Sequence, residues 1–214
     1  MTQTIRHLTP PQVSASHVTE KIICIRGHRE RIFRTDATIE NNKLICHNFG
    51  QGGAGWTFLF GCVQASLNNF ATQLTLNPSF KEKPITVIGA GCYGLLTAIE
   101  LTRMGYDTRI VAQEIDNLPS YKAAGFFFPR PRKSSTVQER ALFESIGMAS
   151  YATYLQIIND NHPFIKNKPK LLPAYYAPHI DPGFGPYREN GLIAHPQQVI
   201  IDFGNGKRYD ALEY

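Results

Sequence analysis

The chain has 214 residues, of which 43% are hydrophobic and 18% are charged, as in an ordinary globular protein of one sizeable domain or two small ones. No apolar run approaches the ~18 residues that a membrane helix needs, and the N-terminus lacks the apolar centre of a secretion signal, so we expect no membrane partner. The net charge of +5 is scattered and comes with no recognisable nucleic-acid-binding module, which argues against a nucleic-acid partner but suits an anionic small molecule.

The first part of the chain predicts short strands followed by a helix. Residues 1–20 are polar and contain prolines, which is typical of a loose lead-in. EKIICIRGHRERIFRTDATI at 20–39 predicts a strand, a turn around Arg26–Glu30 and a second strand. ENNK is a turn signal, and KLICHN at 43–48 predicts a further short strand. A glycine-rich stretch follows, and the apolar residues after it recur at helix spacing, so we expect a helix from about Trp56 onward.

The second part predicts a β–α–β unit, a long helical region and a hairpin. ITVIGAG at 85–91 is typical of a fully buried parallel strand, and it precedes an apolar-periodic helix that ends at Gly105 and a second strand, DTRIVAQE. TVQERALFESIGMASYATYLQIIND at 136–160 predicts one long helix or two. Near the end of the chain, two apolar runs flank Asn205-Gly206, which is a hairpin signal.

The cysteines and histidines show no metal-ligand spacing, so we expect no metal site. For His28 and His47 a hydrogen-bonded or surface role is favoured. The cysteines have no CxxC pair and lie in apolar runs, so we expect buried, reduced thiols and a reducing compartment such as the cytoplasm. They are Cys24, Cys46, Cys62 and Cys92.

Gly89, Gly91 and Gly94 have the G-x-G-x-x-G spacing between the predicted strand and the predicted helix. The first glycine allows a tight turn, the second lets a pyrophosphate approach the backbone, and the third lets helix and strand pack closely. Glu114 stands twenty residues beyond Gly94, where an acid can bind a ribose hydroxyl. Because the helix N-terminus also offers N–H groups to phosphates, the pattern predicts dinucleotide binding; the alternative is a tight turn without a ligand.

A second glycine cluster, QGGAGWT, also enters a helix but lacks that spacing. A helix N-terminus with small residues suits the anionic edge of a flat ring such as reduced flavin, a need that nicotinamide does not share. The cluster therefore favours FAD over NAD(P), with a plain glycine-rich turn as the alternative. Its candidate cofactor-binding residues are Gly52, Gly53, Gly55 and Thr57.

Four segments resemble the D-amino-acid oxidases and D-aspartate oxidases. CHNFGQGGAGWTFLFGC is similar to the family run that supports the flavin, and IRGHRERIFRTD resembles its Arg-x-x-Arg segment, which implies that Arg26 grips the substrate α-carboxylate. KAAGFFFPRP resembles a segment beside the isoalloxazine, which implies a flavin contact for Ala124 and Gly125. ITVIGAGCYGLLTAIELTRMGYDTRIVAQE is similar to the family's fingerprint. The resemblance implies an α/β fold with an FAD-binding Rossmann-like parallel sheet, plus a partial antiparallel portion of a substrate domain.

The sequence departs from the family in three ways. The Arg-x-x-Arg and glycine segments come last in the family and first here, as in a circular permutation or a rearranged chain. The chain is shorter than the family norm, so Tyr175 and Tyr176 are only loose candidates for the substrate-facing tyrosines. Gly27 and Glu30 stand where the family's Arg-x-x-Arg segment carries prolines, and Gln113 occupies an alternative register for the ribose-binding acid.

Three regions are expected: an N-terminal segment with the permuted motifs (1–78), a dinucleotide-binding β–α–β region (79–150) and a partial substrate domain (151–214). The resemblance implies an FAD-dependent oxidase that takes an amino acid or amine, transfers a hydride from Cα to flavin N5, forms an imino acid and passes the electrons to oxygen. A glycine- or sarcosine-type amine oxidase, a catalytically silent or incomplete FAD-binding protein, and an NAD-dependent dehydrogenase stay open. The oligomeric state cannot be read from the sequence.

Overall fold

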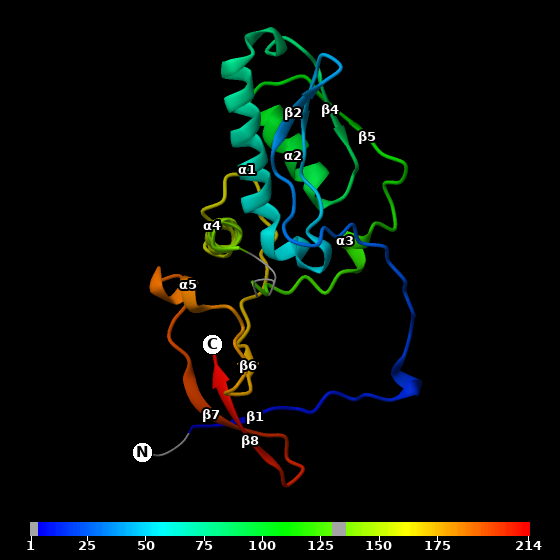
Figure 1. Cartoon of the computed structure of the whole chain (residues 1–214). Helices are drawn as coiled ribbons and strands as arrows, with labels where there is room; N and C mark the ends of the chain where they lie inside the picture. Colours follow the sequence, from blue (N-terminus) through cyan, green and yellow to red (C-terminus); the bar gives the residue numbers. More distant parts are fainter. Residues whose placement is uncertain (1–3, 130–135) are drawn as a thin grey trace. The chain divides into compact units, whose positions relative to one another are not determined.

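The computed structural model describes residues 4–129 and 136–214, which form two compact units (Figure 1). The first, here called the βαβ unit, comprises the described residues of 24–127 and 136–153. The second, the hairpin unit, comprises those of 4–23, 128–129 and 154–214. The fold is mixed α/β with a parallel sheet and antiparallel sheets, which confirms the predicted fold class.

The β–α–β element is present as the sequence predicts. β4 (Ile85–Ile88) and β5 (Thr108–Val111) pair in parallel, and α2 (Cys92–Arg103) connects them (Figure 1). Gly105 has a φ of +90° directly after the last turn of α2. Since a side chain is strained in that left-handed conformation, the glycine ends the helix where its pattern ends.

The prediction that ITVI is a fully buried strand is wrong. Val87 faces α2, because its Cγ1 lies 3.6 Å from the point where a Cβ on Gly94 would lie. Strand alternation therefore turns Ile88 to the other face of the sheet, where it is 87% exposed. Among the described residues this sheet has two strands and α2 against one face, so the β-branched run is only half covered.

A tight hairpin precedes the glycine-rich stretch. β2 (Ala37–Glu40) and β3 (Lys43–Cys46) pair antiparallel, and the connecting Asn41 and Asn42 both have positive φ, at 50° and 57°. Asparagine tolerates this conformation better than most residues, which explains why ENNK turns the chain.

The strand expected at the start of EKIICIRGHRERIFRTDATI is absent. Its apolar residues find no strand partner, and Ile23 is 97% exposed. The expected second strand is reduced to two isolated bridges, His28 with Gln51 and Arg34 with Phe49, before β2 begins. The segment therefore runs beside the glycine-rich stretch without forming a regular ladder.

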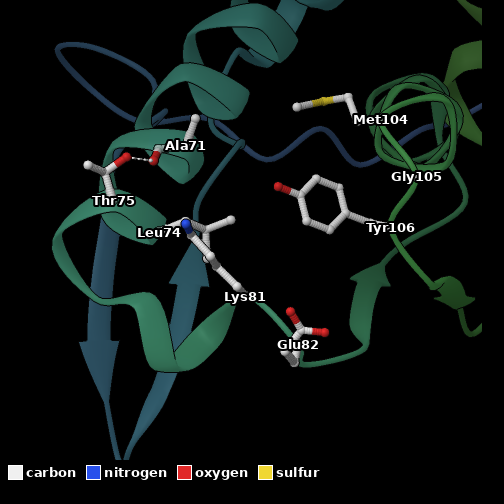
Figure 2. A pocket seen from close by; sticks show the side chains of 8 residues that line it. All are labelled: Ala71, Leu74, Thr75, Lys81, Glu82, Met104, Gly105 and Tyr106. Carbon is white, nitrogen blue, oxygen red and sulfur yellow. Dashed lines mark hydrogen bonds between the residues drawn. The ribbon is translucent and has the colours of Figure 1, made fainter.

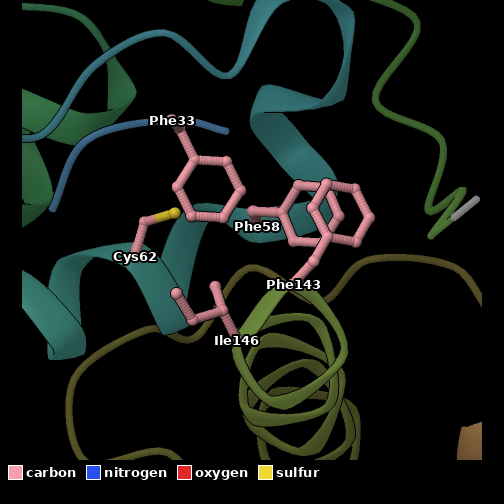
Figure 3. Packing of buried hydrophobic residues seen from close by; sticks show 5 residues of the cluster. All are labelled: Phe33, Phe58, Cys62, Phe143 and Ile146. Carbon is pink, nitrogen blue, oxygen red and sulfur yellow. The ribbon is translucent and has the colours of Figure 1, made fainter. Parts of the chain in front are cut away.

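The core of the βαβ unit lies between α1 (Gly55–Leu76) and α4 (Val137–Ile158), both confirmed as single helices. Figure 3 shows the rings of Phe33, Phe58 and Phe143 packed together, with 4.2 Å between the centroids of Phe58 and Phe143. A Cβ on Gly61 would lie 2.0 Å from the carbonyl oxygen of Ile146, so the glycine permits the two helices to approach. Cys62 and Ile146 complete this aromatic cluster.

The hairpin unit is built on a four-stranded sheet in the order β1–β7–β8–β6. β7 (Gln197–Asp202) and β8 (Arg208–Glu213) form the predicted antiparallel hairpin around Asn205-Gly206. β1 (Thr4–His7) pairs in parallel with β7, so part of the expected loose lead-in is an ordered strand. β6 (Tyr175–Tyr176) pairs with β8, and Val199, Ile201 and Ala211 are the buried core.

No helix in the described part of the chain is long and apolar enough to cross a membrane.

Short helices complete the two units. The short helices of the βαβ unit are η2 (Gly52–Ala54), η3 (Pro78–Phe80) and α3 (Pro119–Lys122), and those of the hairpin unit are η1 (Ala15–His17) and α5 (Gly185–Glu189).

Candidate functional site

The three fingerprint glycines each have a backbone reason at the start of α2. Gly89 has a φ of +104°, and its N–H donates to the carbonyl of Val111 at 2.8 Å, which ties the loop to the end of β5. Gly91 is the residue before the helix, and no side chain caps the helix there. A Cβ on Gly94 would lie 2.0 Å from the carbonyl oxygen of Gly89, so this glycine permits the close packing of helix and loop.

Space for a phosphate lies over the first two of these glycines. No described heavy atom lies within 4 Å of the point where a Cβ would lie on Gly89 or Gly91. The first N–H groups of a helix have no intrahelical acceptor and carry partial positive charge, so the start of α2 attracts an anion. The residues present therefore fit the pyrophosphate of a dinucleotide.

The ribose-binding candidate Glu114 is exposed and stands just beyond the end of β5. Because β4 and β5 are parallel, their carboxyl ends meet at one edge of the sheet, which is also the edge of Gly89. Gln113 is exposed at the same edge, so the backbone leaves both registers of the acid open.

The second glycine cluster is covered by side chains of the preceding segment. Gly52 donates its N–H to the carbonyl of Gly27 at 3.0 Å, and Arg29 donates its N–H to the carbonyl of Gly50 at 3.2 Å. These bonds bring side chains over the glycines: Arg29 Cγ lies 2.6 Å from a Cβ built on Gly50, and Arg26 Nη1 lies 2.8 Å from one built on Gly53. The glycines thus make room for cationic groups of the chain itself, which the sequence alone did not indicate.

Arg26 differs from two neighbouring arginines in its partners. Arg31 pairs with Glu139 at 2.9 Å, and Arg34 makes two hydrogen bonds to the carboxylate of Asp36, whose pKa this contact holds below its ordinary value. Arg26 is exposed, and no hydrogen bond or ion pair engages its guanidinium within the described ranges. A guanidinium without a carboxylate partner, held above a helix start, can bind an external carboxylate.

The two glycine-rich helix starts lie next to each other. The Tyr93 hydroxyl, on the first turn of α2, donates to the carbonyl of Gly55, the first residue of α1, at 2.7 Å. Tyr93 occupies a variable position of the fingerprint, so the motif predicts no role for it. The structure therefore brings Gly53, Gly55 and Arg26 into the same unit and neighbourhood as the fingerprint loop.

Thr57 is buried, and its hydroxyl donates to the carbonyl of Phe126 at 3.4 Å. The bond holds the segment of Ala124 and Gly125 near the start of α1, and both of these residues are exposed. Gly125 has a φ of +72°, which favours glycine at this position. Residues 130 and 131, the last two of the segment KAAGFFFPRP, lie outside the described residues.

The cysteines are unpaired and only partly as expected. Cys62 is buried and Cys92 half-buried, but Cys24 and Cys46 are exposed, which corrects the expectation of four buried thiols. Burial raises the pKa of the Cys62 thiol to about 12, so it stays protonated at neutral pH. In the described chain, no three His, Cys, Asp or Glu side chains lie where they could share a metal ion.

A hollow of about 520 Å³ lies at the opposite ends of α1 and α2 (Figure 2). Leu74 near the end of α1 faces Tyr106 just beyond α2, and Thr75, Lys81 and Met104 also line the hollow. None of the candidate cofactor- or substrate-binding residues lines it. The hollow is therefore separate from the candidate site at the helix starts.

Comparison with known proteins gives one distant match. The chain is 30% identical over 54 residues to a D-amino-acid oxidase of Streptomyces coelicolor (strain ATCC BAA-471 / A3(2) / M145), which is 25% of this chain and 17% of that protein. No protein-family model matches the chain, and no solved structure matches it. The match supports a distant relationship to D-amino-acid oxidases and agrees with an oxidoreductase in general terms.

Proposed function

We propose that the protein is an FAD-dependent oxidoreductase of the D-amino-acid oxidase type, which oxidises an amino acid or amine. The distant match to a D-amino-acid oxidase supports the proposal. The observation that carries it is the position of two glycine-rich helix starts side by side in one unit, with Arg26 above the second and no ion-pair partner for it among the described residues. An anionic cofactor and a carboxylate substrate need these two features in one place.

The chain would hold the cofactor through backbone groups. Gly89 and Gly91 leave the pyrophosphate free access to the first N–H groups of α2, and Glu114 would accept a hydrogen bond from a ribose hydroxyl. When bound, FAD supplies a hydride acceptor whose electrons pass to oxygen. Ala124 and Gly125, held near α1 through Phe126, would lie against the flavin ring.

Arg26 would orient the substrate. Its planar guanidinium can donate two parallel hydrogen bonds to the α-carboxylate, which fixes the direction of the Cα–H bond. Loss of hydride from Cα needs the lone pair of a neutral amine, so an ammonium substrate would have to lose a proton before the Cα–H bond breaks. If the amine binds neutral, no side-chain base is needed. The expected products are an imino acid, which water hydrolyses to an oxo acid, and peroxide.

The test is the visible spectrum of the purified protein with added FAD, followed by anaerobic reduction with a panel of D- and L-amino acids, glycine and sarcosine. We expect bound flavin that one substrate class bleaches. Arg26→Ala should leave the FAD affinity unchanged and slow reduction by a carboxylate substrate about thirtyfold or more, as for a lost charged hydrogen bond of ~2 kcal/mol. A protein that binds no FAD contradicts the proposal, and NAD binding instead would favour a dehydrogenase.

Two further variants sharpen the assignment of Arg26. Gly53→Ala adds a Cβ 2.8 Å from Arg26 Nη1, so it should displace the guanidinium and slow reduction by a smaller factor. Arg31→Ala is the matched control, because it removes an arginine of the same segment that is already paired with Glu139. Equal rates for Arg26→Ala and Arg31→Ala would remove Arg26 from the site.

A catalytically silent or incomplete FAD-binding protein is the second candidate. The observation that favours it is the half-covered parallel sheet, in which Ile88 beside the fingerprint loop is 87% exposed. Flavin that binds but is bleached by none of the substrates would support this candidate over the oxidase.

A further inference from the structure

Tyr93 connects the two glycine-rich helix starts. Its side chain belongs to the fingerprint loop, yet its hydroxyl donates to the carbonyl of Gly55 at the start of α1, at 2.7 Å. Its ring also contacts that helix start, because Cε2 lies 3.7 Å from the point where a Cβ on Gly55 would lie. One residue of the fingerprint therefore fixes the distance between both candidate ligand-binding loops.

The aromatic cluster supports the Tyr93 side chain. In the loop before α1, Gln51 Nε2 donates to Asn48 Oδ1 at 2.9 Å. Cys62 is fully buried in the aromatic cluster, against which Tyr93 also packs. Since packing against this cluster restricts the ring, the Tyr93 hydroxyl is directed at the Gly55 carbonyl.

The hydrogen bond between Tyr93 and Gly55 also acts against an electrostatic repulsion between the two helix starts. Each helix start carries partial positive charge, so two adjacent starts repel each other when no anion lies between them. The bond from the Tyr93 hydroxyl to the Gly55 carbonyl opposes this repulsion in the absence of ligand. A dinucleotide that contacts both starts then pays less to order them, and preorganisation of this kind appears as affinity.

We infer that Tyr93 is a positioning residue that sets the spacing of the α1 and α2 starts for a single dinucleotide spanning both. The inference rests on the proposed function, because it takes the ring end of that dinucleotide to lie at the α1 start. A ligand that occupies only the α2 start, such as ADP, does not depend on this spacing.

The experiment compares FAD and ADP binding to the whole chain and to Tyr93→Phe, which deletes the hydroxyl and keeps the ring. We expect FAD to bind about five- to tenfold more weakly to the variant, as for one lost hydrogen bond, and ADP to bind within twofold of the original affinity. Tyr106→Phe is the control, because it removes a tyrosine hydroxyl just beyond the opposite end of α2. It should change neither affinity.

Hydrogen exchange without ligand gives a second readout. In Tyr93→Phe the amides of residues 52–57 should exchange faster, while those in the middle of α2 keep their rates. Unchanged exchange together with unchanged FAD affinity would overturn the inference and leave the proposed function in place. A parallel loss of FAD and ADP affinity would show a structural role only and also overturn it. If the original chain binds no FAD, the proposed function fails, and the inference with it.

Discussion

The two glycine-rich helix starts use their glycines in different ways. At α2, the space over Gly89 and Gly91 is open to 4 Å, and only Gly94 is packed against protein, namely the backbone of the loop. At α1, the space over Gly50 and Gly53 is occupied by arginine side chains of the segment before β2. The first loop has open space over two of its glycines, whereas two glycines of the second lie under cationic side chains of the same chain.

This difference separates two roles of glycine that look the same in the sequence: one leaves open space, and the other permits close packing. An open glycine such as Gly91 has room for a methyl group in the folded protein. A packed glycine such as Gly94 cannot take one without moving backbone. Alanine substitutions therefore distinguish a glycine with open space above it from a glycine that is packed against backbone, which the sequence motif alone does not.

The largest effect is expected for Gly94→Ala. The added Cβ would lie 2.0 Å from the Gly89 carbonyl oxygen, which is backbone and cannot rotate away. Overpacking of this severity should lower the free energy of unfolding by about 3 kcal/mol or more, measured by urea denaturation. A stability equal to that of the original chain would mean that α2 is not packed against its loop as described.

Gly91→Ala should give the opposite profile. Gly91 has ordinary negative φ, at −70°, and no described atom crowds its Cβ position, so the free energy of unfolding should stay within about 0.5 kcal/mol of the original. The methyl group would occupy the approach of the pyrophosphate, so FAD titration should show at least tenfold weaker binding. Unchanged FAD affinity would place the phosphate elsewhere.

The smallest effect is expected for the pH dependence of stability that arises from two thiols, Cys62 in α1 and Cys92 in α2. Burial raises the pKa of both, and that of Cys62 reaches about 12 from an ordinary value of 9.0. The folded state holds the proton more tightly, so this contribution to stability is complete below pH 9 and is lost as the pH rises toward 12. As the pH rises above 9, each such thiol should make the free energy of unfolding fall more steeply, by up to about 1.4 kcal/mol per pH unit.

Urea denaturation of the original chain and of Cys62→Ala between pH 7.5 and 10.5 measures this contribution. The variant starts from a lower stability, because it leaves a small cavity, but its stability should fall less steeply with pH. Identical slopes would show that the Cys62 thiol is accessible to solvent.

Much of the fold follows from local patterns. The helix periodicity of α1, the strand–glycine–helix order around β4, and Asn205-Gly206 between β7 and β8 each depend on residues close together in the chain. The failures involve distant partners. Ile23 lies in a β-branched run without a strand beside it, and Thr4 lies in a polar segment that pairs with Val199. A local sequence pattern does not show whether a segment far away in the chain will pair with a predicted strand.

The residues of the candidate site also divide into those that the local sequence predicts and those that depend on distant contacts. The fingerprint glycines and Arg26 could be chosen from spacing and resemblance. Tyr93 could not, because its role depends on a carbonyl group in a helix thirty-eight residues earlier in the chain. The cationic side chains over Gly50 and Gly53 were also missed, since only the fold brings the two segments together.

The pairing of β1 with β7 has a consequence for the order of folding during synthesis. β1 precedes the βαβ unit in the chain, whereas its partner strand Gln197–Asp202 follows that unit. The βαβ unit, whose described residues run from 24 to 153, can form while the chain is still growing. β1 therefore has no β7 strand to pair with until the whole βαβ unit has been synthesised, so this edge of the sheet closes only after that unit can fold.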